Sequence, residues 1–407
     1  MTRFAFLLAF AAGSIVSSAQ AEGFNVIEKG HALAVAADCA ACHTASAGNY
    51  AGGVPLSTPF GTLLGSNITP DPETGIGGWS REQFRRAVKQ GISRDGSQLY
   101  PAMPYTDYAN MTDDDVDAIW AYLQTVQPVH NPVESNQLPF PFNQRFALHG
   151  WRWFNQTEGT WAPVPDKSAE WNRGRYLVMG PGHCGACHTP RNMLGGSKGG
   201  DAFLTGATLE NWHAPDITPN TRTGIGSWDT AQIIAYLKTG TNDYDTASGP
   251  MAEEVARSSS QWSDADLKAV ATYLKEGELG WKSAADSAKP LDPKSPSMAT
   301  GQAIYNDRCN ACHVTDGSGI ARLYPRLAGA PLVQADDPTS IIRVVLAGSQ
   351  AGATSAAPTG PVMPAFGTIL NDTQVAAVAD YIRNSWGNAA PKVDADAVKK
   401  LREQLSE

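Results

Sequence analysis

The sequence of 407 residues predicts a mainly α-helical protein built from three small domains in tandem. Three observations support this prediction. A five-residue motif of cysteine and histidine occurs three times at wide intervals, the stretches after the first two copies repeat one another, and each copy is followed by a helix of similar pattern. The length agrees, because such a chain suits two to three domains of about 100–150 residues each.

The motif has the form Cys-x-x-Cys-His, and its three copies contain all six cysteines of the chain. Two thiols one helical turn apart can each add to a vinyl group of a porphyrin, and the histidine that follows can reach the iron as the proximal ligand. The motif therefore predicts three covalently bound haem c groups. The predicted attachment and axial residues are Cys39, Cys42 and His43, then Cys184, Cys187 and His188, then Cys309, Cys312 and His313.

Other chemistries of these cysteines fit less well. A zinc site takes four nitrogen or sulfur ligands, usually from pairs close in sequence, and the pairs here lie far apart along the chain. A redox-active cysteine pair would suit one copy, but it does not explain why histidine follows all three. A disulfide between cysteines separated by two residues has poor geometry.

The composition agrees with haem domains and limits the partners. The chain is acidic, with a formal net charge of −9 at pH 7, which makes nucleic acid and an anionic lipid surface unexpected partners. It contains 39 glycines and 27 prolines, as expected of small domains whose loops enclose a cofactor. Such a domain would be marginally stable as a bare polypeptide, and a buried porphyrin would supply the missing apolar core.

The N-terminus has the features of an export signal, predicted to cover residues 1–21. Arg3 precedes an apolar run from Phe4 to Val16, and Ala19-Gln-Ala21 is a small-x-small cleavage site. The run is short for a membrane anchor, and no other apolar stretch of spanning length follows. The mature chain is expected to begin at Glu22 and to lie in the periplasm or on the periplasmic face of the cytoplasmic membrane.

An internal duplication follows the first two motifs. Residues 67–79 contain Asn-Ile-Thr-Pro-Asp, then Thr-Gly-Ile-Gly and Trp, and residues 216–228 contain Asp-Ile-Thr-Pro-Asn with the same continuation. Each copy leads into a predicted helix that a glycine ends. These helices cover 81–90 and 230–239, and their final glycines are Gly91 and Gly240. The first two domains are thus predicted to be duplicates, and the third, which lacks this insert, to be more compact.

All three domains are predicted to end in a helix with a capping-box start, at Thr112, Ser263 and Asn371. Apolar residues follow each start at helical spacing, and a tyrosine lies late in each helix. We expect these faces to pack on the haem and on the helix before each motif. The residues are Val116, Ile119, Trp120, Tyr122 and Leu123, then Leu267, Val270, Tyr273 and Leu274, then Val375, Val378, Tyr381 and Ile382.

A methionine beside a proline precedes each of these helices and is the predicted sixth ligand of the iron. Met103 lies in Pro-Ala-Met-Pro, Met251 in Gly-Pro-Met and Met363 in Pro-Val-Met-Pro. The prolines favour an extended loop, which could bring the sulfur to the distal face of the haem. A lone methionine usually fills a core, but the repeated context reverses that expectation. The rival methionines are Met111, Met179, Met193 and Met298.

Ligation by histidine and methionine fills both axial positions of the iron, which leaves no coordination site for oxygen or peroxide. Such a haem accepts one electron and passes it on, so the predicted function is electron transfer, with no catalytic residue in this chain. The remaining histidines are isolated, and we expect ordinary structural roles for them. They are His31, His130, His149, His183 and His213.

These motifs, together with the Leu-Pro-Phe-Pro-Phe-Asn-Gln-Arg segment of residues 138–145, resemble the three-haem cytochrome c subunit of bacterial membrane-bound dehydrogenases. Members serve alcohol, gluconate, fructose, sorbitol and aldehyde dehydrogenases, and the resemblance covers nearly the whole mature chain. It implies three tandem class I cytochrome c-like domains, each wrapped around a covalently attached haem.

The resemblance also implies partners. A separate catalytic subunit with a flavin, a quinone (PQQ) or a molybdenum centre would oxidise the substrate, and ubiquinone or a downstream cytochrome or oxidase would take the electrons. Two alternatives stay open. A free-standing periplasmic electron carrier would need no dedicated dehydrogenase, and a peroxidase-like enzyme would need one five-coordinate haem.

The predicted boundaries divide the mature chain into three domains and three connecting or terminal segments. A linker rich in proline and aromatic residues is expected to pin domain one to domain two, with a docking face for the dehydrogenase as the alternative. A second, flexible linker would make domain three mobile and suit it to electron exit. The domains cover 22–127, 166–281 and 298–390, the linkers 128–165 and 282–297, and a charged C-terminal tail 391–407.

The C-terminal tail departs from the family pattern. Family members often carry an extra amphipathic segment there that attaches them to the membrane. Residues 394–407 are short and charged, with only Val398, Leu401 and Leu405 on one face. We therefore predict a solvated helix in place of a membrane anchor. Peripheral membrane attachment through the partner stays open.

Overall fold

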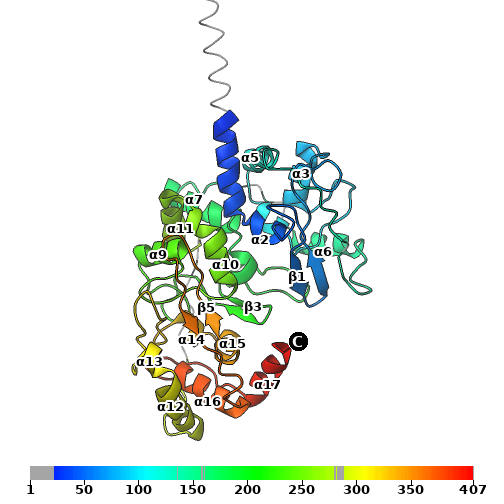
Figure 1. Ribbon diagram of the computed structural model, residues 1–407. Helices are drawn as coiled ribbons and strands as arrows, with labels where there is room; N and C mark the ends of the chain where they lie inside the picture. The colour runs from blue at the N-terminus through cyan, green and yellow to red at the C-terminus, as the bar shows by residue number, and fades with distance from the viewer. Residues whose placement is uncertain are drawn as a thin grey trace, which may run out of the picture. The chain divides into compact units, whose positions relative to one another are not determined.

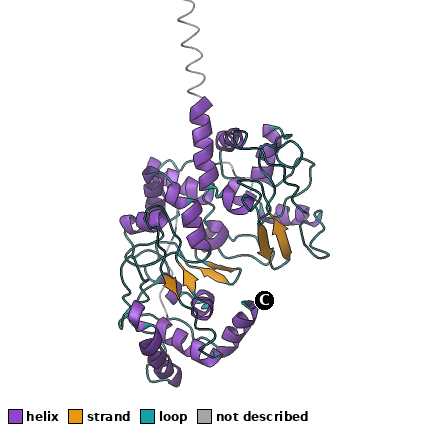
Figure 2. Ribbon diagram, viewed as in Figure 1, coloured by secondary structure: helices purple, strands orange, loops and turns teal. Residues whose placement is uncertain are grey.

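The computed structural model describes residues 23–134, 136–156, 159, 161–278, 281 and 288–406. The predicted export signal and residues 282–287 of the predicted flexible linker lie outside the described residues. The chain divides into two compact units, Met1–Ala162 and Pro163–Glu407. Helices predominate in both, and the strands pair into small two-stranded antiparallel sheets (Figure 2).

The first unit contains the first motif and begins with a helix over residues 23–36, drawn in dark blue in Figure 1. The two strands of this unit pair in the register Leu56 with Leu63. Its other elements are α2 (Cys39–His43), β1 (Pro55–Thr58), β2 (Gly61–Leu64), α3 (Arg81–Gln90), α4 (Tyr105–Tyr108), α5 (Asp113–Leu123) and α6 (Ala147–Asn155).

The second unit contains the second and third motifs. Its first half, around the second motif, consists of α7 (Ala169–Met179), α8 (Gly185–His188), β3 (Ala207–Leu209), β4 (Trp212–Ala214), α9 (Thr230–Thr239), α10 (Pro250–Arg257) and α11 (Asp264–Glu276). The second half consists of α12 (Pro296–Arg308), α13 (Asn310–His313), α14 (Pro331–Gln334), α15 (Thr339–Ala347), β5 (Ser349–Gln350), β6 (Val362–Met363), α16 (Asp372–Arg383) and α17 (Ala395–Gln404).

The predicted helix ends are confirmed. The helices over 81–90 and 230–239 have the predicted bounds, and Gly91 and Gly240 end them with φ of 65° and 76°, a left-handed conformation that favours glycine. The side chains of Thr112, Ser263 and Asn371 all accept a hydrogen bond from the backbone N–H three residues on. Of these three, only Asn371 has the reciprocal bond of a full capping box, because the glutamine three residues on is long enough to reach back.

In each domain the helix before the motif crosses the final helix at a glycine. A Cβ atom at this glycine would lie 1.9–2.0 Å from a carbonyl oxygen of the final helix, and 2.7–2.9 Å from the Cβ of the late tyrosine. The predicted packing of these two helices is therefore confirmed, with the tyrosine at the crossing. The crossings place Gly30 on Ala118 and Tyr122, Gly174 on Ala269 and Tyr273, and Gly301 on Ala377 and Tyr381.

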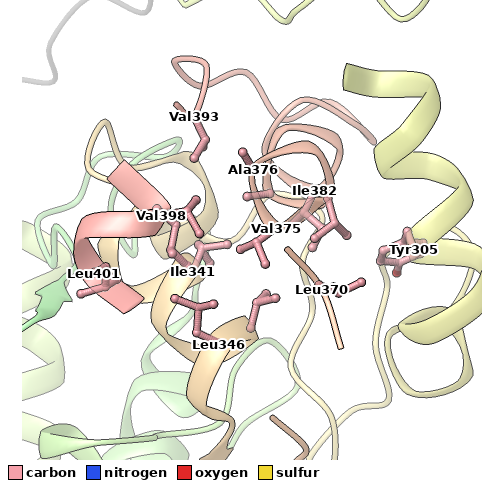
Figure 3. Packing of buried hydrophobic residues seen from close by; sticks show 14 of the residues in the cluster. Tyr305, Ile341, Leu346, Leu370, Val375, Ala376, Ile382, Val393, Val398 and Leu401 are labelled. Atoms are coloured by element: carbon pink, nitrogen blue, oxygen red, sulfur yellow. The ribbon is translucent and has the colours of Figure 1, made fainter. Parts of the chain in front are cut away.

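The C-terminal tail is part of the third domain's core (Figure 3). Val398 and Leu401 of α17 are buried together with Val393 and residues of α15 and α16. Arg402 extends the contact, because its Nε donates to Asp372 at 2.8 Å. The prediction of a solvated helix is thus wrong for this face. The cause is the helical spacing of its apolar residues, which gives α17 one face that packs on the domain.

The third domain packs on the second. The backbone of Ser248 bridges to that of Ala351, and the Arg222 side chain donates to the Ala389 carbonyl at 2.6 Å. Helix α12 begins at Pro296, inside the predicted flexible linker. These contacts hold the third domain on the second, which argues against the predicted mobile third domain.

The aromatic linker contacts the first domain, but part of it is exposed. Its residue Gln137 bridges Thr62, and the ring of Trp151 packs edge-on against Tyr105 with centroids 6.2 Å apart. Trp153, by contrast, is 82 % exposed, and its neighbour Phe154 is also exposed. These two side chains therefore do not pack into a core, contrary to the expectation for the linker aromatics.

Candidate haem sites

Each motif forms a single helical turn at the end of the helix before it, in α2, α8 and α13. This turn places the two cysteines three residues apart on one side of the helix. Among the described residues, none of the six cysteines forms a disulfide. They therefore fit two-point attachment of a porphyrin.

Each of the three motif histidines makes the same kind of hydrogen bond, between its ring Nδ1 atom and a backbone carbonyl oxygen. The Nδ1 atom of His43 lies 2.6 Å from the Ser66 carbonyl oxygen, and that of His188 lies 2.7 Å from the carbonyl oxygen of Pro215. In the third motif the same atom lies 3.0 Å from the Pro325 carbonyl. A carbonyl oxygen only accepts, so Nδ1 bears the proton and Nε2 keeps its lone pair for a metal.

Burial favours the neutral histidines that iron ligation needs. Burial lowers the pKa of His43, His188 and His313, against the opposing effect of the carbonyl contact. It also raises the pKa of the Cys39 thiol to about 12 and that of Cys309 to about 11. These two thiols are thus held neutral, and the three imidazoles are neutral and oriented, which fits a haem c group.

The duplicated loops directly follow two of these acceptor carbonyls. Directly after Ser66, the Asn67 side chain accepts the Thr69 N–H at 3.0 Å. Directly after Pro215, the Asp216 side chain accepts the Thr218 N–H at 2.7 Å. Sequence reasoning found the repeated Ile-Thr-Pro segments without assigning them a role. In the structure each segment begins directly after the carbonyl that accepts from the motif histidine, and its first side chain caps its own backbone.

Two of the predicted methionine ligands share a core with their motif. Met103 and Cys39 pack against the same cluster in the first domain, and Met363 and Cys309 do so in the third. Met251 packs against the small cluster of residues 247–255 in the second domain.

The predicted extended loop is found at only one of these methionines. Met363 lies on strand β6, whereas Met103 lies in a turn and Met251 lies in the first turn of helix α10. Pro250 explains the difference at Met251, because proline is favoured at the first position of a helix, where no N–H bond is lost.

The rival methionines lie elsewhere. Met111 and Met298 are buried in the cores of the first and third domains, and the side chain of Met193 is fully exposed. In the parts of the chain that the structure describes, no group of three or more histidine, cysteine or acidic residues could hold a metal ion.

The sequence model of the cytochrome c family matches residues 27–127, 172–278 and 298–386, one segment for each motif. The chain belongs to the cytochrome c family. The family implies covalently bound haem c, in agreement with the free thiols and the oriented histidines.

Relatives of this cytochrome match almost the whole chain. It is 42 % identical to the cytochrome c subunit of a quinone-type alcohol dehydrogenase from Gluconobacter oxydans, over 93 % of this chain and 82 % of the relative. It is 40 % identical to the cytochrome c subunit of gluconate 2-dehydrogenase from Pantoea cypripedii, over 93 % and 89 %. The fructose dehydrogenase cytochrome subunit of Gluconobacter japonicus is also 40 % identical, over 92 % and 82 %. The resemblance to dehydrogenase cytochrome subunits is thus confirmed.

The sequence did not predict the contact between the third domain and strand β4 of the second domain. The Ser340 hydroxyl accepts the His213 N–H at 2.7 Å and donates to the His213 carbonyl at 3.0 Å. The Arg343 guanidinium lies 4.6 Å from the centroid of the Trp212 ring. These contacts hold strand β4, which leads directly to Pro215. His213 has the ordinary structural role expected of it, and no pattern in the sequence marks Ser340.

Among the described residues, no helix has both the length and the apolar character needed to cross a bilayer.

Proposed function

We propose that this cytochrome binds three haem c groups and relays electrons from a catalytic dehydrogenase subunit to ubiquinone or to the respiratory chain. The repeated Nδ1–carbonyl bond at the three motif histidines is the observation that supports it most strongly. The proposed thioether residues are Cys39, Cys42, Cys184, Cys187, Cys309 and Cys312, and the proposed axial pairs are His43 with Met103, His188 with Met251 and His313 with Met363.

The residues of this chain have three tasks in that function. The cysteines attach the cofactor, the carbonyl-bound histidines orient it from one side, and the methionines close the other side against small ligands. Bound haem supplies one-electron redox chemistry. A thioether ligand raises the reduction potential relative to a second histidine, which suits acceptance of the electrons that a dehydrogenase removes from an alcohol, sugar, sugar acid or aldehyde.

The relatives and the N-terminus support the proposed partner and location. Relatives are named as cytochrome subunits of alcohol, gluconate and fructose dehydrogenases, so we propose a catalytic dehydrogenase subunit as the electron donor. Its centre would be of the flavin, PQQ or molybdenum type. The predicted signal of residues 1–21 supports export to the periplasm or to the periplasmic face of the cytoplasmic membrane.

The haem count is tested on protein exported by a host with haem attachment machinery. Pyridine haemochrome analysis is expected to give three equivalents per chain, and single replacement of Cys39, Cys184 or Cys309 by serine should leave the other two sites loaded. Fewer than three equivalents in the unaltered chain would contradict the proposal.

The electron-transfer role is tested with the native complex. The catalytic subunit should co-purify with this chain, and addition of its substrate should reduce all three haems in the visible spectrum. Purification without any dehydrogenase would favour the free-standing carrier. Binding of carbon monoxide or cyanide to the native protein would reveal an open iron and favour a haem enzyme.

A further inference from the structure

Six exposed aromatic side chains lie on the first unit, and we refer to them together as the aromatic face. It consists of side chains that are between 45 % and 82 % exposed. Their rings form two close pairs, Phe60 with Phe142 at 4.8 Å and Trp153 with Phe154 at 5.3 Å between centroids. The aromatic face comprises Phe60, Phe140, Phe142, Phe146, Trp153 and Phe154.

The aromatic face is fixed to the segment that contains Met103. The Tyr100 hydroxyl donates to the Phe142 carbonyl at 3.0 Å, and the Arg145 guanidinium lies 5.3 Å from the Tyr100 ring centroid. Tyr100 and Tyr105 hold Met103 from both sides, because the Met103 N–H donates to the Tyr100 carbonyl and the Tyr105 N–H donates to the Met103 carbonyl. Whatever covers the aromatic face therefore lies next to the proposed distal ligand of the first haem.

The local charge differs from that of the whole chain. Residues 136–156, which contain most of the aromatic face, include Arg145 and Arg152 and no aspartate, glutamate or lysine. This segment is therefore cationic in a chain with a net charge of −9. The acidity of the chain as a whole argued against an anionic lipid surface, but that argument does not hold for this segment.

We propose that the aromatic face is where this cytochrome rests on a lipid bilayer. Tryptophan and phenylalanine insert at the level of the lipid headgroups, and neighbouring arginines interact with the phosphates. The face combines a short helix with a loop, and its side chains project to different extents. A fluid bilayer can adapt to such an uneven surface, whereas a protein partner would need a surface of complementary shape.

This contact would give the proposed function a route to its acceptor. Ubiquinone is dissolved in the bilayer, so a lipid contact beside Met103 makes the first haem domain the site of electron exit. That step rests on the proposed function, whereas the lipid contact itself does not.

The test uses the haem-loaded full-length protein and vesicles of phosphatidylethanolamine and phosphatidylglycerol. In a flotation assay the unaltered protein should bind, and the double variant Trp153→Ser/Phe154→Ser should bind at least about tenfold more weakly, because two inserted aromatic side chains are lost. Trp153→Phe should retain most of the binding. Leu194→Ser and Ile369→Ser remove side chains that are each 54 % exposed in the second unit and should change nothing.

Equal vesicle binding by the double variant and the unaltered protein would overturn the proposal. So would loss of the co-purifying dehydrogenase with vesicle binding unchanged, which would assign the aromatic face to a protein partner. Reduction of the haems by the dehydrogenase in detergent solution is measured separately. If that reduction never occurs while the aromatic face still binds vesicles, the proposed function fails and the lipid contact stands.

Discussion

The first two cytochrome c domains are alike on the side of the motif histidine and differ on the side of the methionine. On the histidine side, a polar residue follows the acceptor carbonyl in both, Asn67 in the first and Asp216 in the second. On the methionine side, Met103 lies in a turn held by two tyrosines, and Met251 lies in the first turn of α10. The duplication has therefore kept one half of the site and changed the other.

The neighbours of each methionine segment explain this difference. In the first domain the segment contacts the aromatic linker through Tyr100 and Tyr105. In the second domain Ser248, three residues before Met251, bridges the backbone of the third domain at Ala351. The proposed haem attachment would dictate the geometry of the histidine side, whereas the methionine side also has to fit the segments that pack beside it.

The largest effect is expected where the two domains are most alike, at the helix crossing. Gly174→Ala places a Cβ atom 2.0 Å from the Ala269 carbonyl oxygen, and Gly30→Ala creates the same clash with Ala118. A helix backbone cannot yield at such a contact, so each variant should lose at least about 3 kcal/mol of stability. Thermal unfolding of the holoprotein and the yield of attached haem measure the loss.

A matched control for the crossing lies in helix α6. Nothing lies within 4 Å of a Cβ atom added at Gly150, and its φ is not left-handed. Gly150→Ala should therefore leave stability unchanged or raise it by about 0.5–1 kcal/mol through helix propensity. If the crossing variants and this control had the same stability, the two helices would have to lie further apart than in the structure.

The next effect concerns the methionines, where the two domains differ. Met103→Ala, Met251→Ala and Met363→Ala should each lower the reduction potential of one haem, by on the order of 0.1–0.3 V, because axial ligands set potentials over a range of about 0.8 V. Redox titration followed at the haem bands measures the shift. Met111→Leu, in the core of the first domain, should leave all three potentials in place. An unchanged titration in any of the alanine variants would mean that its ligand assignment is wrong.

The helices and the histidine half of the sites could be predicted from the sequence because each depends on local patterns. The bounds of α3 and α9 follow from periodicity and a final glycine, and the motif itself marks the proposed attachment residues. The docking of α17 and the contact of Ser340 with His213 could not be predicted, because both depend on segments far apart in the chain. An amphipathic helix such as α17 indicates that its apolar face is covered, but it does not indicate which part of the chain covers that face.

A pH effect is expected at a position where the second domain differs from the first. Three residues after the methionine the first domain has Thr106 and the second has Glu254, whose pKa burial raises to about 7. The folded protein thus keeps a proton that the unfolded chain loses above about pH 4.5, so stability should fall by roughly 2 kcal/mol as pH rises from about 5 to about 7. Denaturant unfolding across this range measures the slope, and Glu254→Gln should reduce it.

The control for this pH effect is the exposed neighbour of the buried carboxylate. Glu253 forms a surface ion pair with Arg257 at 3.3 Å, and Glu253→Gln should keep the slope of the unaltered protein. If Glu254→Gln and Glu253→Gln gave the same slope, the buried carboxylate would not be its source.

The smallest effect is expected at the contact that distinguishes the second domain from the first, its packing against the third. Arg343→Ala removes the guanidinium over the Trp212 ring and should cost about 1 kcal/mol, a shift of about 2–4 °C in the unfolding of the second unit. Arg343→Lys should keep part of the effect, since an ammonium group also interacts with the ring face. Arg81→Ala, an exposed arginine of the first unit, serves as the control. An unchanged Tm in Arg343→Ala would revive the mobile third domain, because the packing that argues against it would then contribute nothing measurable.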